Sequence, residues 1–162
     1  MFGLFRRKQK VAIDPPQLSE SEKQALVKEL EKAADDELTP VEEALVLVRP
    51  GATPEALTGL FARLEHATIG ILAKDPQDLE TMLVLKDSSG ESAIAVFTSL
   101  VRTTPVTARF PEHTFFLQLE IRGLVQGINN IGISINPFDE AVRFYMTAEM
   151  VEILKRIISK PA

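Results

Sequence analysis

The sequence predicts an α+β fold, with a helical N-terminal part and a mixed β-sheet of about five or six strands that has helices packed against it. Three observations predict this class. Helix-start signals cluster before residue 55, β-prone runs begin at residue 68, and short helices interrupt these runs irregularly. The chain has 162 residues, of which 45% are hydrophobic, and this suits one domain. We place the domain at residues 19–160, after a flexible, basic and proline-containing segment at 1–18.

Capping sequences mark where the helices begin. Ser19 and Glu22 form a capping box ahead of apolar residues at 26, 30 and 33. Thr39-Pro40-Val41-Glu42 combines an N-cap, a proline at the first helical position and a glutamate at the third. The helix that follows is apolar on nearly all sides until it stops at Pro50-Gly51, so we expect it to be buried. Two more helices are predicted after Thr53 and after Thr147.

Six β-prone runs follow these first helices. They are predicted at residues 68–73, 79–86, 92–98, 115–121, 131–135 and 141–146. The second and third form a hairpin around a loop that contains Gly90. Residues 92–98 are apolar on both faces, which favours a central strand. Gly132 and Ser134 alternate with isoleucines, which indicates that another element approaches that face closely.

The residue inventory argues against several kinds of reaction centre. Cysteine is absent, which removes disulfides, thiolate catalysis and cysteine-ligated metals. His66 and His113 belong to no metal-binding histidine pair. Thr98 and Ser99 follow a strand, but the strained glycine-flanked serine elbow is missing, so we interpret them as cap or turn residues. We therefore predict no catalytic residue, no metal and no cofactor, and we lean against an enzyme without excluding one.

Charge is unevenly distributed along the chain. The net charge is -5, but Arg6, Arg7, Lys8 and Lys10 contribute +4, so the rest carries -9. An acidic body argues against a nucleic-acid partner. Residues 1–10 could touch an anionic membrane surface, but they hold little apolar area, so a solvated terminus is the favoured interpretation. The opening residues lack the order of a secretory signal and no apolar run is long enough to span a membrane, so we expect a cytoplasmic protein.

Several short motifs in the second half occur in a familiar order. Ala95-Val96-Phe97-Thr98-Ser99 is followed by Gly132-Ile133-Ser134-Ile135-Asn136-Pro137, and then by a strand and a helix opening at residues 144–150. This order, over roughly residues 40–158, resembles the SseB N-terminal domain family of bacterial SseB-like proteins. The resemblance implies an α+β fold but no reaction, because the family's biochemical role is unassigned. The family often has glycine directly after Asn-Pro, whereas this chain has Phe138.

Six residues are candidates for ligand or partner binding: Asn136, Pro137, Phe138, Arg102, Arg109 and Arg143. Asn136 could present its amide to a ligand, although an amide that satisfies turn amides while the following proline stops the strand is the favoured interpretation. For Arg102 and Arg109, solvated surface is favoured over anion binding. The adjacent carboxylates Asp139 and Glu140 are interpreted as solvated.

Two functional hypotheses follow. The first is a non-enzymatic interaction or regulatory module that binds an unknown protein or a second copy of itself. Its apolar patch would include Phe110, Phe115, Phe116 and Phe138, although burial in the core is favoured for the middle two. The alternative is a sensor or enzyme for an anionic metabolite or amino acid. Its site would be assembled from Arg102, Arg109, Arg122, Asn136 and Arg143.

Overall fold

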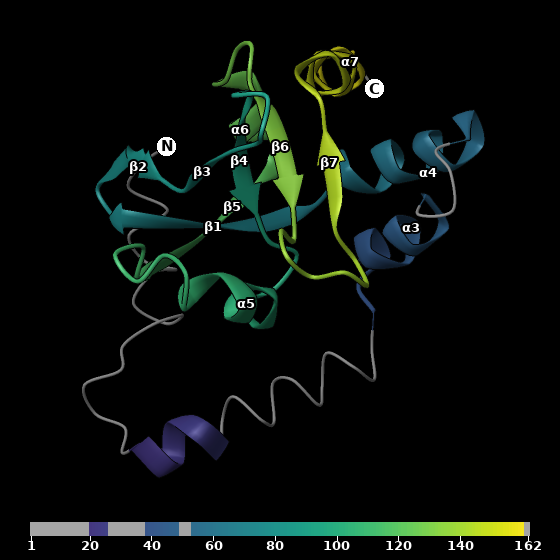
Figure 1. The fold of residues 1–162 in the computed structure, drawn as a ribbon. Coiled ribbons are helices and arrows are strands. Elements are labelled where there is room, and N and C mark those ends of the chain that lie inside the picture. Colours follow the sequence, from purple (N-terminus) through teal and green to yellow (C-terminus); the bar gives the residue numbers. More distant parts are fainter. Residues whose placement is uncertain (1–19, 26–37, 49–52, 161–162) are drawn as a thin grey trace.

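Figure 1 shows two crossing sheets surrounded by helices. The computed structural model describes residues 20–25, 38–48 and 53–160. Residues 20–25 are helical, but Ser19 and the apolar face predicted at 26, 30 and 33 lie outside the described residues, as do Pro50-Gly51 and the segment 1–18. The predicted domain start at residue 19 therefore stays a prediction. None of the described helices has the length and apolar character that a membrane crossing requires.

From residue 38 onwards, two helices come first, four strands follow, and helices and strands are mixed after them. The helices are α3 (Pro40–Val48), α4 (Pro54–Leu64), the 3-10 helix η2 (Leu100–Thr103), α5 (Thr104–Thr107), α6 (Ile121–Gln126) and α7 (Ala148–Ser159). The strands are β1 (Thr68–Asp75), β2 (Asp78–Met82), β3 (Val84–Lys86), β4 (Ser92–Val96), β5 (Phe115–Glu120), β6 (Gly132–Ile135) and β7 (Phe144–Met146).

The α+β class is confirmed, but the strands form two sheets rather than one. An antiparallel sheet has the order β2-β1-β5, and a mixed sheet has the order β3-β4-β6-β7 with β4 parallel to β6. The run predicted as one strand at 79–86 divides at Leu83. The amide of Leu83 donates to Leu72 in the first sheet at 2.7 Å, and its carbonyl accepts from Ala95 in the second at 3.0 Å. Leu83 therefore links the two sheets.

The helix starts agree with their capping sequences. The Thr39 hydroxyl accepts from the Glu42 amide at 3.2 Å, while the Glu42 carboxylate accepts from the Thr39 amide at 3.3 Å. The hydroxyls of Thr53 and Thr147 likewise accept amides of the first turn of α4 and α7, each at 3.2 Å. Each threonine therefore satisfies an amide that the helix itself leaves without a partner.

The prediction that α3 is buried holds for one face of the helix only. Val41, Leu45 and Val48 are buried, but Val46 is 43% exposed and Leu47 is 71% exposed. The reason is that only one face of α3 joins the core shared with α4 and the sheets. A uniformly apolar stretch shows no difference between the covered face and the open one, so the sequence could not distinguish them.

Strand β4 lies between two layers, as its pattern predicted. Ile94 and Val96 face the larger core cluster, while Ala95 and Phe97 join a second cluster. The close approach predicted at Gly132 is also present, since a β-carbon there would lie 2.6 Å from the Met146 carbonyl oxygen. The absence of a side chain at Gly132 lets β6 and β7 approach each other closely. The small residues also leave a shallow depression on one face of the mixed sheet.

Candidate functional site

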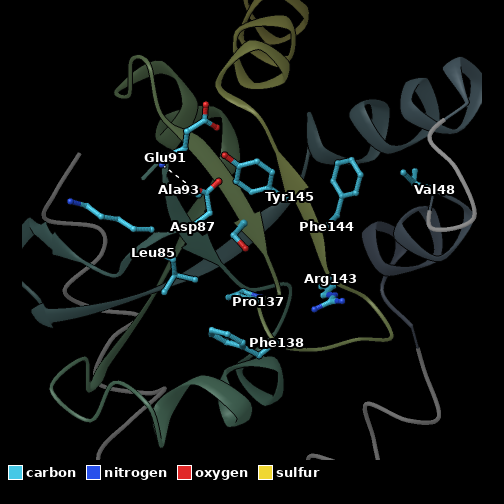
Figure 2. Close-up of a pocket in the computed structure, with 12 residues that line it drawn as sticks. Val48, Leu85, Asp87, Glu91, Ala93, Pro137, Phe138, Arg143, Phe144 and Tyr145 are labelled. Carbon is cyan, nitrogen blue, oxygen red and sulfur yellow. Dashed lines mark hydrogen bonds between the residues drawn. The ribbon is translucent and has the colours of Figure 1, made fainter. Parts of the chain in front are cut away.

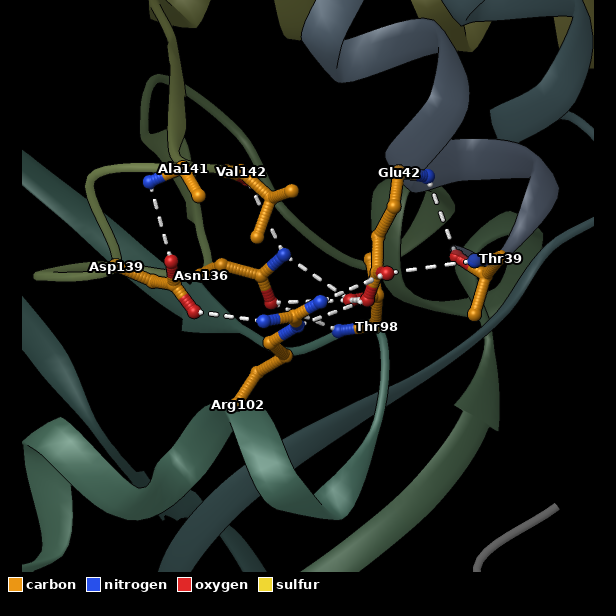
Figure 3. Close-up of polar contacts among 8 residues, drawn as sticks. All are labelled: Thr39, Glu42, Thr98, Arg102, Asn136, Asp139, Ala141 and Val142. Atoms are coloured by element: carbon orange, nitrogen blue, oxygen red, sulfur yellow. Dashed lines mark hydrogen bonds and ion pairs between the residues drawn. The ribbon is translucent and has the colours of Figure 1, made fainter. Parts of the chain in front are cut away.

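A largely buried polar cluster joins the loop between β6 and β7 to the body of the domain (Figure 3). It consists of Glu42, Thr98, Arg102, Asn136 and Asp139. Arg102 donates through Nε and Nη2 to the two carboxylate oxygens of Glu42, each at 3.0 Å, and through Nη1 to Asp139 at 3.1 Å. Glu42 is 1% exposed and Arg102 9%. The cluster thus joins α3 and η2 to the β6–β7 loop.

Asn136 is the hydrogen-bonding centre of that loop. Its Oδ1 accepts from the Thr98 amide at 3.0 Å, and its Nδ2 donates to the Thr98 hydroxyl at 3.0 Å and to the Val142 carbonyl at 3.2 Å. Its own amide donates to Val96 at 2.8 Å. Asn136 is fully buried and has a left-handed backbone with φ 47°. Its side chain therefore holds loop backbone in place, and the exposed residues of the loop begin at Phe138.

The charges of this cluster are fixed by their partners. Burial raises the pKa of Glu42, but hydrogen bonds from Arg102 and Thr98 and the charge of Arg102 outweigh it, so the pKa lies below its usual 4.5. The hydrogen bond to Glu42 raises the pKa of Arg102. Each charged group is satisfied inside the protein. The cluster is therefore suited to holding three segments together rather than to transferring a proton.

Two interpretations from the sequence are corrected here. Arg102 was expected on the solvated surface, and Asp139 was expected to be solvated, but they are paired and largely buried. The physical reason is the carboxylate of Glu42, which compensates the buried guanidinium from 60 positions away in the chain. Nor do all the arginines of the alternative hypothesis converge on one site. Arg122 lies 3.8 Å from Glu65, at another part of the surface.

A groove of about 620 Å³ lies on the open face of the mixed sheet (Figure 2). Small residues, Ala93 and Ser134, form its floor. Leu85 and Tyr145 stand beside them, because Leu85 pairs with Ala93 and Tyr145 pairs with Ser134 across neighbouring strands. Tyr145 is 39% exposed. Small side chains flanked by larger ones thus create the groove.

The groove ends in the β6–β7 loop on one side. Pro137, Phe138 and Arg143 line this end. Phe138 is 38% exposed and has a left-handed backbone with φ 67°. The guanidinium carbon of Arg109 lies 4.1 Å from the centre of the Phe138 ring. A basic, aromatic end results. The glycine expected from the family at this position would suit the same backbone without strain.

The opposite end lies at the β3–β4 turn and is acidic. Asp87 and Glu91 line it together with Lys86. Asp87 organises the turn by accepting from the Ser89 amide, the Ser89 hydroxyl and the Glu91 amide, and the Ser89 hydrogen bond is the main cause of its lowered pKa. Burial raises the pKa of the Tyr145 phenol, and Glu91 and Asp87 raise it further. This end therefore carries the ionised carboxylate of Asp87 close to a neutral phenol.

The structure separates the six candidate residues into two groups. Pro137, Phe138 and Arg143 line the groove and Arg109 stacks at its rim, whereas Asn136 and Arg102 lie sealed in the polar cluster.

The four phenylalanines of the predicted apolar patch have different surroundings, and the burial favoured for Phe116 is confirmed. Phe116 is buried, Phe110 packs on the second core cluster, and of the four phenylalanines only Phe138 lines the groove. Sequence reasoning missed Tyr145 and Ser134 as site residues. The alternating small residues of β6 were a usable signal for both, because they mark a low sheet face beside taller neighbours.

The described residues contain no candidate metal site. Within residues 20–25, 38–48 and 53–160, no group of three histidine, aspartate or glutamate side chains is placed to hold an ion. His66 and His113 both lie at element boundaries, after α4 and before β5.

Comparison with known proteins bears on the family. A family model described as the SseB protein N-terminal domain matches residues 41–152, which include both the polar cluster and the groove. The comparisons with curated proteins and with solved structures found no match. The match covers well over half of the chain and agrees with the order of motifs that runs from Phe97 to the last helix. The chain therefore belongs to the SseB N-terminal domain family.

Proposed function

We propose that this chain is a non-enzymatic interaction module whose working surface is the groove on the mixed sheet. The observation that carries the proposal is the groove itself, an apolar hollow with two exposed aromatic rings, Phe138 and Tyr145. Exposed apolar surface of this kind costs solvation free energy unless something covers it. The expectation of a cytoplasmic location accompanies this proposal and stays a prediction.

The shape of the groove favours a segment of a partner protein. Its floor is low because Ala93 and Ser134 are small, so the backbone of a bound segment can approach the sheet. Aromatic side chains in the walls supply large contact area with little loss of conformational entropy. Charged residues stand at the two ends rather than at the centre, which is the usual arrangement of a protein interface.

The contrast with the polar cluster supports a binding role over a catalytic one. The side chains best suited to catalysis are those of Glu42, Arg102 and Asn136. They already form hydrogen bonds within the protein. The metabolite hypothesis needs Arg102 and Asn136 at one accessible site with Arg143, but the first two are buried. Binding by surface complementarity needs neither of them.

A photo-crosslinking experiment tests the proposal. Tyr145 is replaced by p-benzoylphenylalanine in cells that produce the protein, and the adducts are compared with those from the same replacement at Ile153. Ile153 is 45% exposed on α7 and does not line the groove. We expect a discrete adduct from the groove position alone, and its loss when Ser134→Tyr fills the groove floor. The same adducts from both positions, or an adduct that survives Ser134→Tyr in a folded protein, would contradict the proposal.

A further inference from the structure

Two arginines without a carboxylate partner stand at the Phe138 end of the groove. Arg143 is exposed and lines the groove, and none of the ion pairs within the described part of the chain involves it. Arg109 is also exposed, and its described contact is the ring of Phe138. Figure 2 shows Arg143 and Phe138 on the same side of the groove. This end therefore presents two positive charges that form no ion pair within the described residues.

Stacking prepares Arg109 to receive a carboxylate. The guanidinium carbon lies over the Phe138 ring, 4.1 Å from its centre, which is within cation–π distance. The guanidinium is planar and carries its N–H donors in a fixed fork. That fork matches the two oxygens of a carboxylate. Because the ring already orders Arg109, binding loses little side-chain entropy there.

Phe138 keeps an unfavourable backbone while its ring is partly exposed. A bulky residue at φ 67° is a rare conformation that the surrounding structure has to enforce. The residue is 38% exposed, so contacts inside the protein cover only part of it. Local strain together with an exposed ring points to a role outside the chain, since an ordinary turn residue at this φ would be glycine or asparagine.

We propose that the occupant of the groove is an apolar segment of a partner protein that ends in carboxylates, and that this end docks on Phe138, Arg109 and Arg143. The inference rests on the proposed function, because it names the partner chemistry for the same groove. At the far end the carboxylates of Asp87 and Glu91 outnumber the single cation of Lys86, so this end repels carboxylates on balance and favours one direction of the segment.

Other acidic groups near the arginines leave this direction unchanged. Asp139 is paired with Arg102 beneath the loop. Glu140 is exposed in the loop but does not line the groove.

Synthetic peptides provide the probe. Short peptides share a core of leucine, isoleucine, valine and phenylalanine in varied order, and carry paired glutamates, lysines or serines at either end. The full chain is applied to an array of them, and those that bind are measured in solution by fluorescence anisotropy. We expect binding by peptides with glutamates at one end, none by peptides with lysines in the same place, and weakening as salt rises.

Variants locate that binding in the groove. Arg143→Glu should weaken glutamate-ended peptides about tenfold and admit lysine-ended ones, since like charges then meet. Phe138→Gly, which relaxes the backbone as it removes the ring, should weaken binding about thirtyfold if the ring is an anchor. Arg156→Glu on α7, an exposed arginine that does not line the groove, is the matched control and should leave affinity unchanged.

The outcomes separate this inference from the proposed function. Suppose that Ser134→Tyr blocks binding, but that peptides bind equally well whatever their charge and are unaffected by Arg143→Glu. This result would overturn the acidic-partner inference and leave the groove as a binding surface. If no set binds, or if Ser134→Tyr has no effect on binding, both fail. A dimer in sedimentation velocity that Ser134→Tyr dissolves would show that the occupant is a second copy of the chain, and would also overturn this inference.

Discussion

Asn136 and Phe138 stand two positions apart in one loop and illustrate opposite uses of the same backbone. Both are left-handed, with φ 47° and 67°. Asn136 is fully buried and bonded to Thr98 and Val142, whereas Phe138 exposes 38% of its surface beside the groove. Asparagine adopts this conformation at little cost, whereas phenylalanine adopts it only under strain. The comparison teaches that the polar cluster fixes the loop, and that the loop then presents a strained aromatic residue to the surface.

The largest expected effect comes from breaking the cluster at Arg102. Arg102→Met leaves the buried carboxylate of Glu42 without its partner, so the free energy of unfolding should fall by about 3–5 kcal/mol. Urea denaturation measures it. The control is Lys74→Met, which removes the exposed pair with Glu112 and should change little. Equal losses for the two variants would show that the cluster does not hold the fold together.

The next effect comes from Asn136. Asn136→Ala removes the bonds to Thr98 and Val142 and places alanine in a left-handed conformation, so we expect a loss of about 2–4 kcal/mol in urea denaturation. Asn136→Gly loses the same hydrogen bonds but keeps a relaxed backbone, and should be more stable than the alanine variant by about 1 kcal/mol. Two variants of equal stability would argue against a backbone contribution.

Acid should weaken the cluster through Glu42. Its pKa is below 4.5 in the folded state, so its contribution to stability is fully present above the unfolded value and is lost as pH falls through the folded value. The urea midpoint should therefore hold down to about pH 4.5 and decline below it. In Glu42→Gln this part of the decline should be missing. An identical acid profile in that variant would show that other carboxylates dominate.

The smallest effect sharpens the comparison at Phe138. Replacement by alanine usually leaves a protein more stable than replacement by glycine, but at φ 67° the order should reverse. The free energy of unfolding of Phe138→Gly, measured by thermal or urea denaturation, is expected to exceed that of Phe138→Ala by about 1 kcal/mol. Position Ala62, exposed on α4, is the control where alanine should be the more stable of the two. The ordinary order at both positions would remove the evidence for strain.

Local chemistry was sufficient to predict much of the fold. The caps at Thr39, Thr53 and Thr147 and the strand end at Asn136 depend on neighbouring residues, so the sequence displays them directly. The division of one β-prone run at Leu83 depends on bonds to Leu72 and Ala95, which no local pattern shows.

The candidate site was predicted only in part, because much of it depends on contacts between residues that are distant in the sequence. Phe138 was identified because it follows the distinctive Asn-Pro pair, and Arg143 was identified as one of the arginines of the metabolite hypothesis. The burial of Arg102 was not predicted, because its partner Glu42 lies 60 positions away. Tyr145 was missed because its place in the groove wall depends on cross-strand pairing with Ser134.

One measurement tests the central claim that the cluster holds the loop and the groove does the binding. The crosslinker at position 145 is combined with Thr98→Val in the cluster or with Ser134→Tyr in the groove, and both adduct yield and stability are measured. Thr98→Val should lower the free energy of unfolding by about 1–3 kcal/mol yet keep the adduct, whereas Ser134→Tyr should keep the stability and lose the adduct. A folded Thr98→Val protein that forms no adduct, or a Ser134→Tyr protein that forms it undiminished, would contradict the account.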